Sequence, residues 1–232
     1  MTVLSRLAEL NERLEAAGLV EAQGYAPARI AYILVLGRNG RLVEVESTLH
    51  EVQVGKARRL LAREFPMPVP VTRTGNFAPN LLWDTAEYAL GLDKDPAKPD
   101  PKTPLRHAAF KKEVAAIAMA LPEDEGVRAV HRFLEALDPK AFAATAAGTA
   151  IEDRKLNVSF RLEGEMCLVP ERPAVRRLLE MRSASQDGAP EGQCLVTGRT
   201  GPIARLHPPI KGVAGAQTSG ARIVAFGGQC RH

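Results

Sequence analysis

Residues 29–47 read RIAYILVLGRNGRLVEVES, and this stretch decides what kind of sheet the chain forms. Its first half, up to Leu36, is apolar and rich in β-branched residues, which is typical of a buried strand. The Asn39-Gly40 pair that follows is a strong signal for a hairpin turn. In the second half valines alternate with glutamates, so one face of the returning strand stays in water. We therefore expect two antiparallel strands joined by a tight turn.

Helices flank this hairpin in the sequence. Upstream, leucines recur at three- and four-residue intervals and predict an amphipathic helix that ends near Gly18, with its leucine stripe in the core: Leu4, Leu7, Leu10 and Leu14. Downstream, Pro104 opens one apolar-striped helix and a second follows Pro122, which predicts a helical hairpin. With a strand at 156–163, the pattern predicts an α+β fold. Antiparallel strands and the helical hairpin then carry long functional loops.

The cation-rich and proline-rich segments before residue 72 are less regular. Residues 56–63, KARRLLAR, place four cations around a short apolar centre, which fits either a helical turn or a strand edge. Prolines at alternate positions from 66 to 70 exclude a helix interior and a central strand, and favour an extended edge segment. Two shorter elements are expected near the later strand: a return strand at 166–169 and a helix from Pro173.

Residues 81–90, LLWDTAEYAL, predict a short helix. Gly91 is its expected stop, and Asn80 is a candidate N-cap. Trp83 and Tyr88 lie among leucines, and we expect them in the core rather than stacked on a base. The charged, proline-rich run after Leu92 predicts a mobile surface loop.

Composition restricts the partners and the compartment. The 232-residue chain has a formal charge of +4 and an isoelectric point near 9.1, which admits a nucleic-acid partner without requiring one. Three scattered cysteines without a CxxC pair favour a reducing cytoplasm over a disulfide framework. Glutamates interrupt the N-terminal leucines, so this helix is predicted to be neither a secretory signal nor a membrane span.

No pattern typical of an active site or a cofactor site is present in the sequence. Acidic residues and histidines show no nucleophile–base or metal-ligand spacing, which argues against an enzyme. Cys194 and His207 have a separation seen in some zinc sites, but the second Cys and the second His are missing. We expect no catalytic residue, no metal and no cofactor.

The stretch at 192–226, GQCLVTGRTGPIARLHPPIKGVAGAQTSGARIVAF, reads as strand fragments joined by tight turns and suits a polyanion. From residue 192 to the end, five cations face no Asp or Glu: Arg199, Arg205, Lys211, Arg222 and Arg231. Arg205 and Lys211 are candidate contacts for phosphate or for an acidic partner subunit. Gln217 is a candidate for insertion at a duplex fork or against base edges, with Thr218 and Ser219 as sugar or phosphate donors. The alternatives are a flexible turn and solvated cations.

A second polar loop spans residues 72–80, TRTGNFAPN. The amides of Asn76 and Asn80 suit bidentate pairing with adenine or a place in the minor groove. Arg73 and Thr74 are candidate phosphate contacts. The alternatives are that the asparagines cap turns or the next helix and that the loop face is merely solvated.

Several blocks, in order, resemble a known family. They are the Asn39-Gly40 hairpin, RTGNFAPNLLWDTAEYALGLD at 73–93, the helical hairpin, NVSFRLEG at 157–164 and the glycine-rich block that ends at Phe226. This arrangement is similar to the N-terminal portion of the large subunit of the type I-C CRISPR Cascade complex. The resemblance implies that residues 1–232 form the N-terminal domain, with a helical-hairpin insertion near 103–150. It also implies that the C-terminal helical part of the family is absent here.

The resemblance implies a non-catalytic, cytoplasmic subunit of an antiviral surveillance complex. Such a subunit reads the protospacer-adjacent motif on double-stranded DNA and aids duplex opening for crRNA pairing. The implied partners are target DNA, the crRNA 5′ end, the Cascade backbone subunits and a recruited helicase-nuclease. We expect the two polar loops to converge on the duplex. One rival is a protein-interaction module that contacts the backbone subunits, the crRNA end or an inhibitor; the other is a nuclease, for which the carboxylate cluster is missing.

Overall fold

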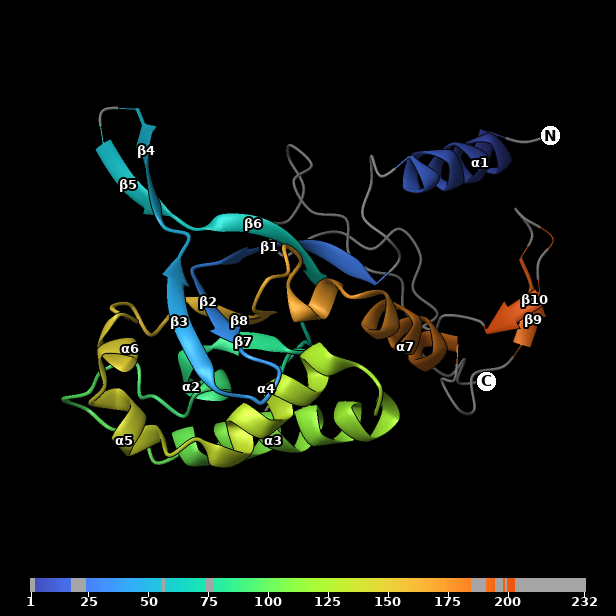
Figure 1. Cartoon of the computed structure of the whole chain (residues 1–232). Coiled ribbons are helices and arrows are strands. Elements are labelled where there is room, and N and C mark those ends of the chain that lie inside the picture. The colour runs from blue at the N-terminus through green and yellow to red at the C-terminus, as the bar shows by residue number, and fades with distance from the viewer. Residues whose placement is uncertain are drawn as a thin grey trace, which may run out of the picture. The chain divides into compact units, whose positions relative to one another are not determined.

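The computed structural model describes residues 3–17, 24–55, 57–73, 77–184, 191–194, 198 and 200–202. It divides the chain into two compact units. Residues 21–180 form the larger unit, and residues 1–20 together with 181–232 form the smaller one. The α+β fold class predicted from the sequence is confirmed in the larger unit, where a sheet is covered by helices (Figure 1).

A four-stranded sheet in the order β3-β2-β8-β7 forms the centre of the larger unit. The predicted hairpin is confirmed: β2 (Tyr32–Leu36) pairs antiparallel with β3 (Leu42–Ser47). On its other side β2 pairs with β8 (Asn157–Leu162), and this pair is parallel. All five residues of β2 are buried, because the strand has neighbours on both edges and side chains on both faces.

The apolar run at 29–36 is two strands and not the single strand that its composition predicts. β1 (Tyr25–Ile30) leaves the central sheet and pairs with β6 (Arg63–Pro68). The break falls at Ala31, whose N–H donates to Asn157 O at 2.9 Å and whose carbonyl accepts the Thr48 N–H at 2.9 Å. These two long-range hydrogen bonds hold Ala31 between the sheets.

Both irregular segments before residue 72 form strands: the cation-rich run that the sequence leaves open, and the proline-rich run expected as an extended edge. The cation-rich run contributes to β5 (Ala57–Leu61), which pairs with β4 (His50–Val54) in a separate two-stranded ribbon. The expected extended edge is confirmed in β6, which forms a two-stranded sheet with β1 among the described residues. Prolines at 66 and 68 are tolerated because this strand lies at an edge.

The predicted helical hairpin is confirmed in α3 (Thr103–Ala120) and α4 (Glu125–Ala136). Asp124 caps α4 by accepting the Val127 N–H at 2.9 Å. The hairpin lies against the central sheet, where Phe160 of β8 packs between Phe110 and Phe133, with ring centroids 6.3 and 6.2 Å apart. The helices therefore share one hydrophobic core with the sheet. Two short helices, α5 (Pro139–Ala143) and α6 (Ala146–Thr149), follow the hairpin.

The prediction of a helix over residues 81–90 is wrong for the first half of this segment. Residues 83–85 form β7 (Trp83–Thr85), which pairs with β8, and α2 (Ala86–Ala89) begins only after it. Thr85 is the N-cap, so the N-cap role considered for Asn80 is excluded. Trp83 and Tyr88 are buried as predicted, and the Trp83 indole donates to Pro68 O at 3.1 Å.

Two elements near the end of the larger unit differ in extent from the prediction. The return strand expected at 166–169 is reduced to a single antiparallel bridge between Arg161 and Leu168. The one-turn 3-10 helix η1 (Val169–Glu171) follows, because Pro170 has no N–H to continue a ladder. The helix expected from Pro173 is confirmed as α7 (Pro173–Ala184).

In the smaller unit, α1 (Val3–Ala16) confirms the predicted N-terminal helix. Its leucine stripe, however, is not core: Leu4 is 59% exposed, and Leu7 and Leu10 are exposed as well. This helix does not belong to the unit that holds the main hydrophobic core. β9 (Glu191–Gln193) pairs antiparallel with β10 (Thr200–Pro202), and the remainder of the predicted strand-and-turn stretch lies outside the described residues. Within the part of the chain that is described, no helix has the length and apolarity needed to span a membrane.

Candidate nucleic-acid interface

The polar loop at 72–80 is anchored by the carboxylate of Asp84. Asp84 is 1% exposed and accepts N–H groups from Asn80 at 2.9 Å and from Thr85 at 2.8 Å. It also pairs with the guanidinium of Arg73. Burial raises the pKa of Asp84, and the Asn80 N–H and the Arg73 charge act in the opposite direction. The carboxylate therefore ties the start of the loop to its end.

Arg73 spans this loop instead of standing free in solvent. Its Nε donates to Ala78 O at 2.9 Å, and its guanidinium carbon lies 4.1 Å from the centroid of the Tyr88 ring. About a third of the side chain, 31%, stays exposed. The structure thus gives Arg73 a role in shaping the loop, in addition to the phosphate contact expected from the sequence.

Asn80 has a supporting position. Its side chain is buried, and its Oδ1 accepts the Val71 N–H at 3.0 Å. This hydrogen bond joins the two flanks of residues 74–76. Thr74 and Asn76 themselves lie outside the described residues.

A basic hollow lies beside the described part of the loop. It has a volume of about 350 Å³ and is lined by Arg73, Phe77, Thr85, Glu87, Tyr88, Lys94, Lys102 and Arg106. Four of these residues are cations and one is an acid. The buried Glu87 is 3.0 Å from Lys94 Nζ and 3.0 Å from an Arg106 Nη, and Arg106 also reaches Asp100 at 2.6 Å. Arg73, Lys94 and Arg106 are thus paired with carboxylates, and Lys102 is the lining cation that has no ion pair among the described residues, which suits a contact with an anion such as a phosphate.

The sequence shows these cations but not their common position. Lys94 and Lys102 lie in the proline-rich run that predicts only a surface loop, and Arg106 lies on α3. In the structure this loop is closed by hydrogen bonds, such as Asp100 N to Asp93 Oδ1 at 3.0 Å. Glu87 forms ion pairs with both Lys94 and Arg106, so these two cations lie close together. The only signal in the sequence is the density of charge in residues 93–106.

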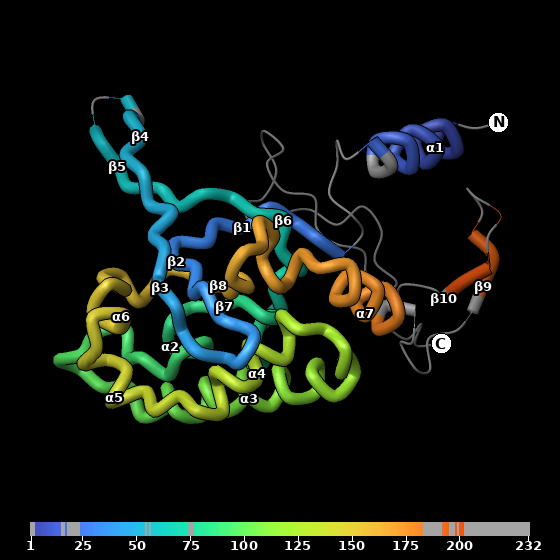
Figure 2. The backbone as a smooth tube through the Cα atoms, in the orientation of Figure 1, coloured from blue at the N-terminus to red at the C-terminus, as the bar shows by residue number. Residues whose placement is uncertain are grey.

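The β4–β5 ribbon carries two further arginines, Arg58 and Arg59, for which the sequence predicts no role. It projects away from the central sheet (Figure 2). Arg58 pairs with Glu51 at 3.2 Å, and the exposed Arg59 has no ion pair among the residues that the structure describes. A two-stranded antiparallel ribbon has dimensions that fit the major groove of B-DNA.

The second predicted loop lies within residues 203–232, outside the described part of the chain. This holds for Arg205, Lys211, Gln217, Thr218 and Ser219, and also for His207. Cys194 is exposed. Within the described residues no group of three or more His, Cys, Asp or Glu side chains is placed to hold a metal ion.

These features define an α+β protein whose cations gather beside an anchored polar loop and on a projecting ribbon. The chain belongs to a family of CRISPR-associated proteins, described as CRISPR-associated protein (Cas_Csd1), which it matches over residues 7–229. It is therefore a component of a CRISPR antiviral defence system. Among curated proteins, none matches the chain.

Proposed function

We propose that this chain reads the protospacer-adjacent motif for a type I-C CRISPR surveillance complex, as the N-terminal portion of its large subunit. It binds the short duplex that carries the motif and helps to open it. Guide RNA then reads the rest of the target by base pairing. The chain itself carries out no reaction.

The anchored loop at 72–80 is the observation that carries this proposal. A side chain that reads a base edge must be held within a fraction of an ångström, so the segment that presents it needs fixed ends. Asp84, Arg73 and Asn80 fix both flanks of residues 74–76. Thr74 and Asn76 are therefore assigned the contacts with phosphate and base, and Asn80 supports them.

Affinity and specificity come from different parts of the protein in this proposal. The cations of the basic hollow and of the β4–β5 ribbon contact phosphates, which contribute affinity but carry no sequence information. Asn76 and Gln217 contact bases, with Arg205, Lys211, Thr218 and Ser219 on the backbone near Gln217. This arrangement requires the two loops to meet at the duplex. The crRNA 5′ end, the backbone subunits and a helicase-nuclease are the partners of the assembled complex.

Binding of the assembled complex to duplex DNA tests this proposal. We expect Asn76→Ala and Gln217→Ala each to weaken binding to a motif-bearing duplex by about 1–3 kcal/mol, and to leave binding to a duplex with a scrambled motif unchanged. Asn11→Ala, on the exposed surface of α1, is the matched control. If both loop variants bind the motif-bearing duplex as tightly as the unmodified complex, the motif-reading role is wrong.

The exposed leucine stripe of α1 favours a second function, that of a protein-interaction module. Leu4, Leu7 and Leu10 present apolar surface that a backbone subunit would cover. The experiment compares the free chain with the assembled complex, with and without the motif and at two salt concentrations. Motif-dependent binding by the free chain supports direct reading. Binding that appears only after assembly, and assembly that is lost in Leu4→Ser/Leu7→Ser, support the interaction module.

A further inference from the structure

The basic hollow beside the 72–80 loop contains an aromatic side chain that the hydrophobic core does not use. Phe77 lines this hollow and is only partly buried. It belongs to neither of the hydrophobic clusters of the described chain. Its ring also forms no aromatic or cation–π pair with another described residue. Because an aromatic side chain is normally stabilised by packing against other apolar groups, the ring of Phe77 is available to a ligand.

The backbone that follows Phe77 is held in place. Ala78 O accepts a hydrogen bond from Arg73 Nε at 2.9 Å, and the Asn80 N–H donates to the buried carboxylate of Asp84 at 2.9 Å. The other aromatic residue of the lining, Tyr88, is 4% exposed, and the guanidinium of Arg73 covers its ring. Between these two rings, Phe77 is therefore the one that a ligand can reach.

Lys102 gives the hollow a positive charge that no described carboxylate neutralises. The other lining cations are in ion pairs: Arg73, Lys94 and Arg106. Lys102 is exposed and forms no ion pair within the described part of the chain. The volume of the hollow, about 350 Å³, lies near the lower end of the range of about 300–1,000 Å³ that is usual for small-molecule sites. A stacking ring and an unpaired ammonium group in a space of this size suit a single nucleotide.

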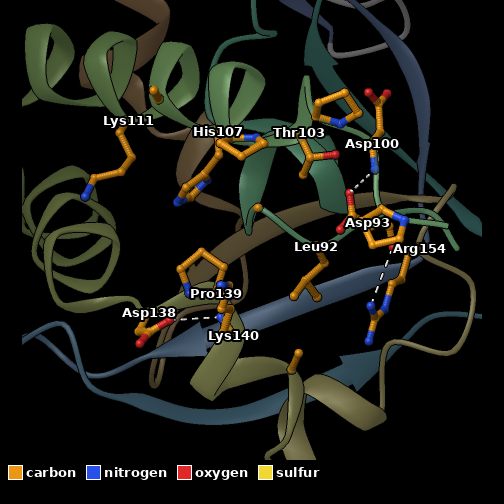
Figure 3. Close-up of a pocket in the computed structure, with 16 residues that line it drawn as sticks. Leu92, Asp93, Asp100, Thr103, His107, Lys111, Asp138, Pro139, Lys140 and Arg154 are labelled. Carbon is orange, nitrogen blue, oxygen red and sulfur yellow. Dashed lines mark hydrogen bonds between the residues drawn. The ribbon is translucent and has the colours of Figure 1, made fainter. Parts of the chain in front are cut away.

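A larger cavity, of about 670 Å³, lies between α3 and the start of α5 (Figure 3). No Phe, Tyr or Trp side chain of the described residues lines it. Its lining has no excess of cations, because three carboxylates and three cations contribute to it: Asp93, Asp100, Asp138, Lys111, Lys140 and Arg154. Of these two spaces, the basic hollow is the one that combines an aromatic ring with an excess of positive charge.

We infer that the basic hollow captures one unpaired nucleotide, with the base stacked on Phe77 and a phosphate at Lys102. Stacking on an aromatic side chain accepts any base, because every base has a π face. The nucleotide can therefore come from the DNA strand that is displaced beside the motif or from the 5′ end of the crRNA. This inference rests on the proposed function, in which the duplex is opened next to the motif, and deepens it: a captured DNA base cannot pair again with its partner.

Binding of the whole chain to a short single strand tests the stacking, with an abasic strand of the same length as the reference. Both strands carry the same phosphates, so the difference between their affinities comes from the bases. We expect the strand with bases to bind about fivefold more tightly or better, the lower limit for stacking of one base. Phe77→Leu, which keeps an apolar side chain but removes the ring, should abolish the difference, and Phe77→Trp should retain it. Phe65→Leu, at another partly buried phenylalanine, is the matched control.

Lys102→Ala should weaken the binding of both strands by the same factor, since a phosphate contact does not depend on the base. Lys140→Ala, at an exposed lysine of the larger cavity, should leave both affinities unchanged. Thermal unfolding confirms that each variant is folded. The inference is overturned if the unmodified chain binds the abasic strand as tightly as the strand with bases, or if Phe77→Leu and Phe65→Leu reduce the difference equally.

Photo-crosslinking in the assembled complex distinguishes the two sources of the nucleotide. Iodouracil, which crosslinks to an aromatic side chain on which it stacks, is placed either in the DNA beside the motif or at the 5′ end of the crRNA. A crosslink to Phe77 identifies the strand that supplies the base, and the absence of a crosslink from both strands overturns the inference.

Failure of base capture is separable from failure of motif reading. The ratio of affinities for motif-bearing and scrambled duplexes depends on Asn76 and Gln217 in the proposed function, so it should be the same in Phe77→Leu and in the unmodified complex. A complex that crosslinks through Phe77 without preferring the motif contradicts motif reading alone. A complex that prefers the motif without this crosslink contradicts base capture alone.

Discussion

Arg73 and Asp84 form an ion pair across the base of the 72–80 loop, with Asp84 almost fully buried and Arg73 stacked over Tyr88. This pair connects the core of the larger unit to the loop that we assign to motif reading. The carboxylate also accepts two backbone N–H groups, from Asn80 and Thr85, so it holds both ends of the loop.

Replacing Asp84 should destabilise the fold. Asp84→Ala leaves Arg73 and two N–H groups without their acceptor, and loss of one partner from a largely buried pair costs about 3 kcal/mol. Urea unfolding of the whole chain measures the change. Glu51→Ala breaks the exposed pair with Arg58 and should cost less than about 1 kcal/mol. Equal costs for the two variants would contradict the anchoring role of Asp84.

Gly40 should not tolerate a side chain. Its φ is +83°, and an added Cβ would lie 2.6 Å from Arg132 Cβ and 2.9 Å from Phe133 N. Gly40→Ala should therefore cost more than the roughly 1–2 kcal/mol of backbone strain alone. Gly164 has a φ of +79° and open space around it, so Gly164→Ala should show the strain without the clash. Subtracting the loss of unfolding free energy in Gly164→Ala from the loss in Gly40→Ala gives the part that comes from packing of the hairpin turn against α4.

His107 should make stability fall as the pH falls below about 6.5, its ordinary pKa. Burial lowers the pKa of His107 in the folded state, so the unfolded chain binds more protons in this range. Stability then decreases with acidification until the folded-state pKa is reached. Urea midpoints at pH 7.5 and pH 5.5 should differ less in His107→Gln than in the unmodified chain. If the urea midpoint changes equally between pH 7.5 and pH 5.5 in both proteins, the His107 imidazole does not contribute to the pH dependence of stability.

Lys102 of the basic hollow should act on DNA without regard to sequence. Lys102→Ala removes one phosphate contact, so it should weaken binding evenly to all duplexes and reduce the salt slope of log K by about 0.9. We expect the same of Lys211→Ala. Lys98→Ala, in the same loop but outside the lining, serves as the control. A loss confined to the motif-bearing duplex would indicate base reading by these lysines instead.

Local patterns predicted part of the fold correctly. The Asn39-Gly40 hairpin and the α3–α4 hairpin depend on turn chemistry and helical periodicity, which act over a few residues. The break at Ala31 depends on hydrogen bonds with Asn157 and Thr48, which no local pattern shows. Likewise, residues 83–85 read as helix but become β7 because β8 pairs with them from 72 or more residues away.

The candidate site was predictable only in its residue types. The net charge admitted a nucleic-acid partner without requiring one, and the polyanion hypothesis came from the glycine-rich stretch at 192–226, whose cations face no acid. The polar side chains of the 72–80 loop made it the second candidate. The burial of Asn80 and Asp84 depends on packing, so the sequence offered Asn80 only as a base contact or as a cap of a turn or helix. The cavity between α3 and the start of α5 was not predicted, because its walls come from segments far apart in the sequence, such as those that hold His107, Pro139 and Arg154.

The parallel pairing of β2 with β8 has a consequence for synthesis on the ribosome. β2 is complete at Leu36, but its parallel partner β8 ends only at Leu162. During synthesis the apolar strand β2 therefore keeps one edge without hydrogen-bond partners until more than a hundred further residues have been added. The nascent α3–α4 hairpin is finished before β8 and can shield that strand in the interval. Translation speed through residues 103–162 should therefore influence the yield of native protein.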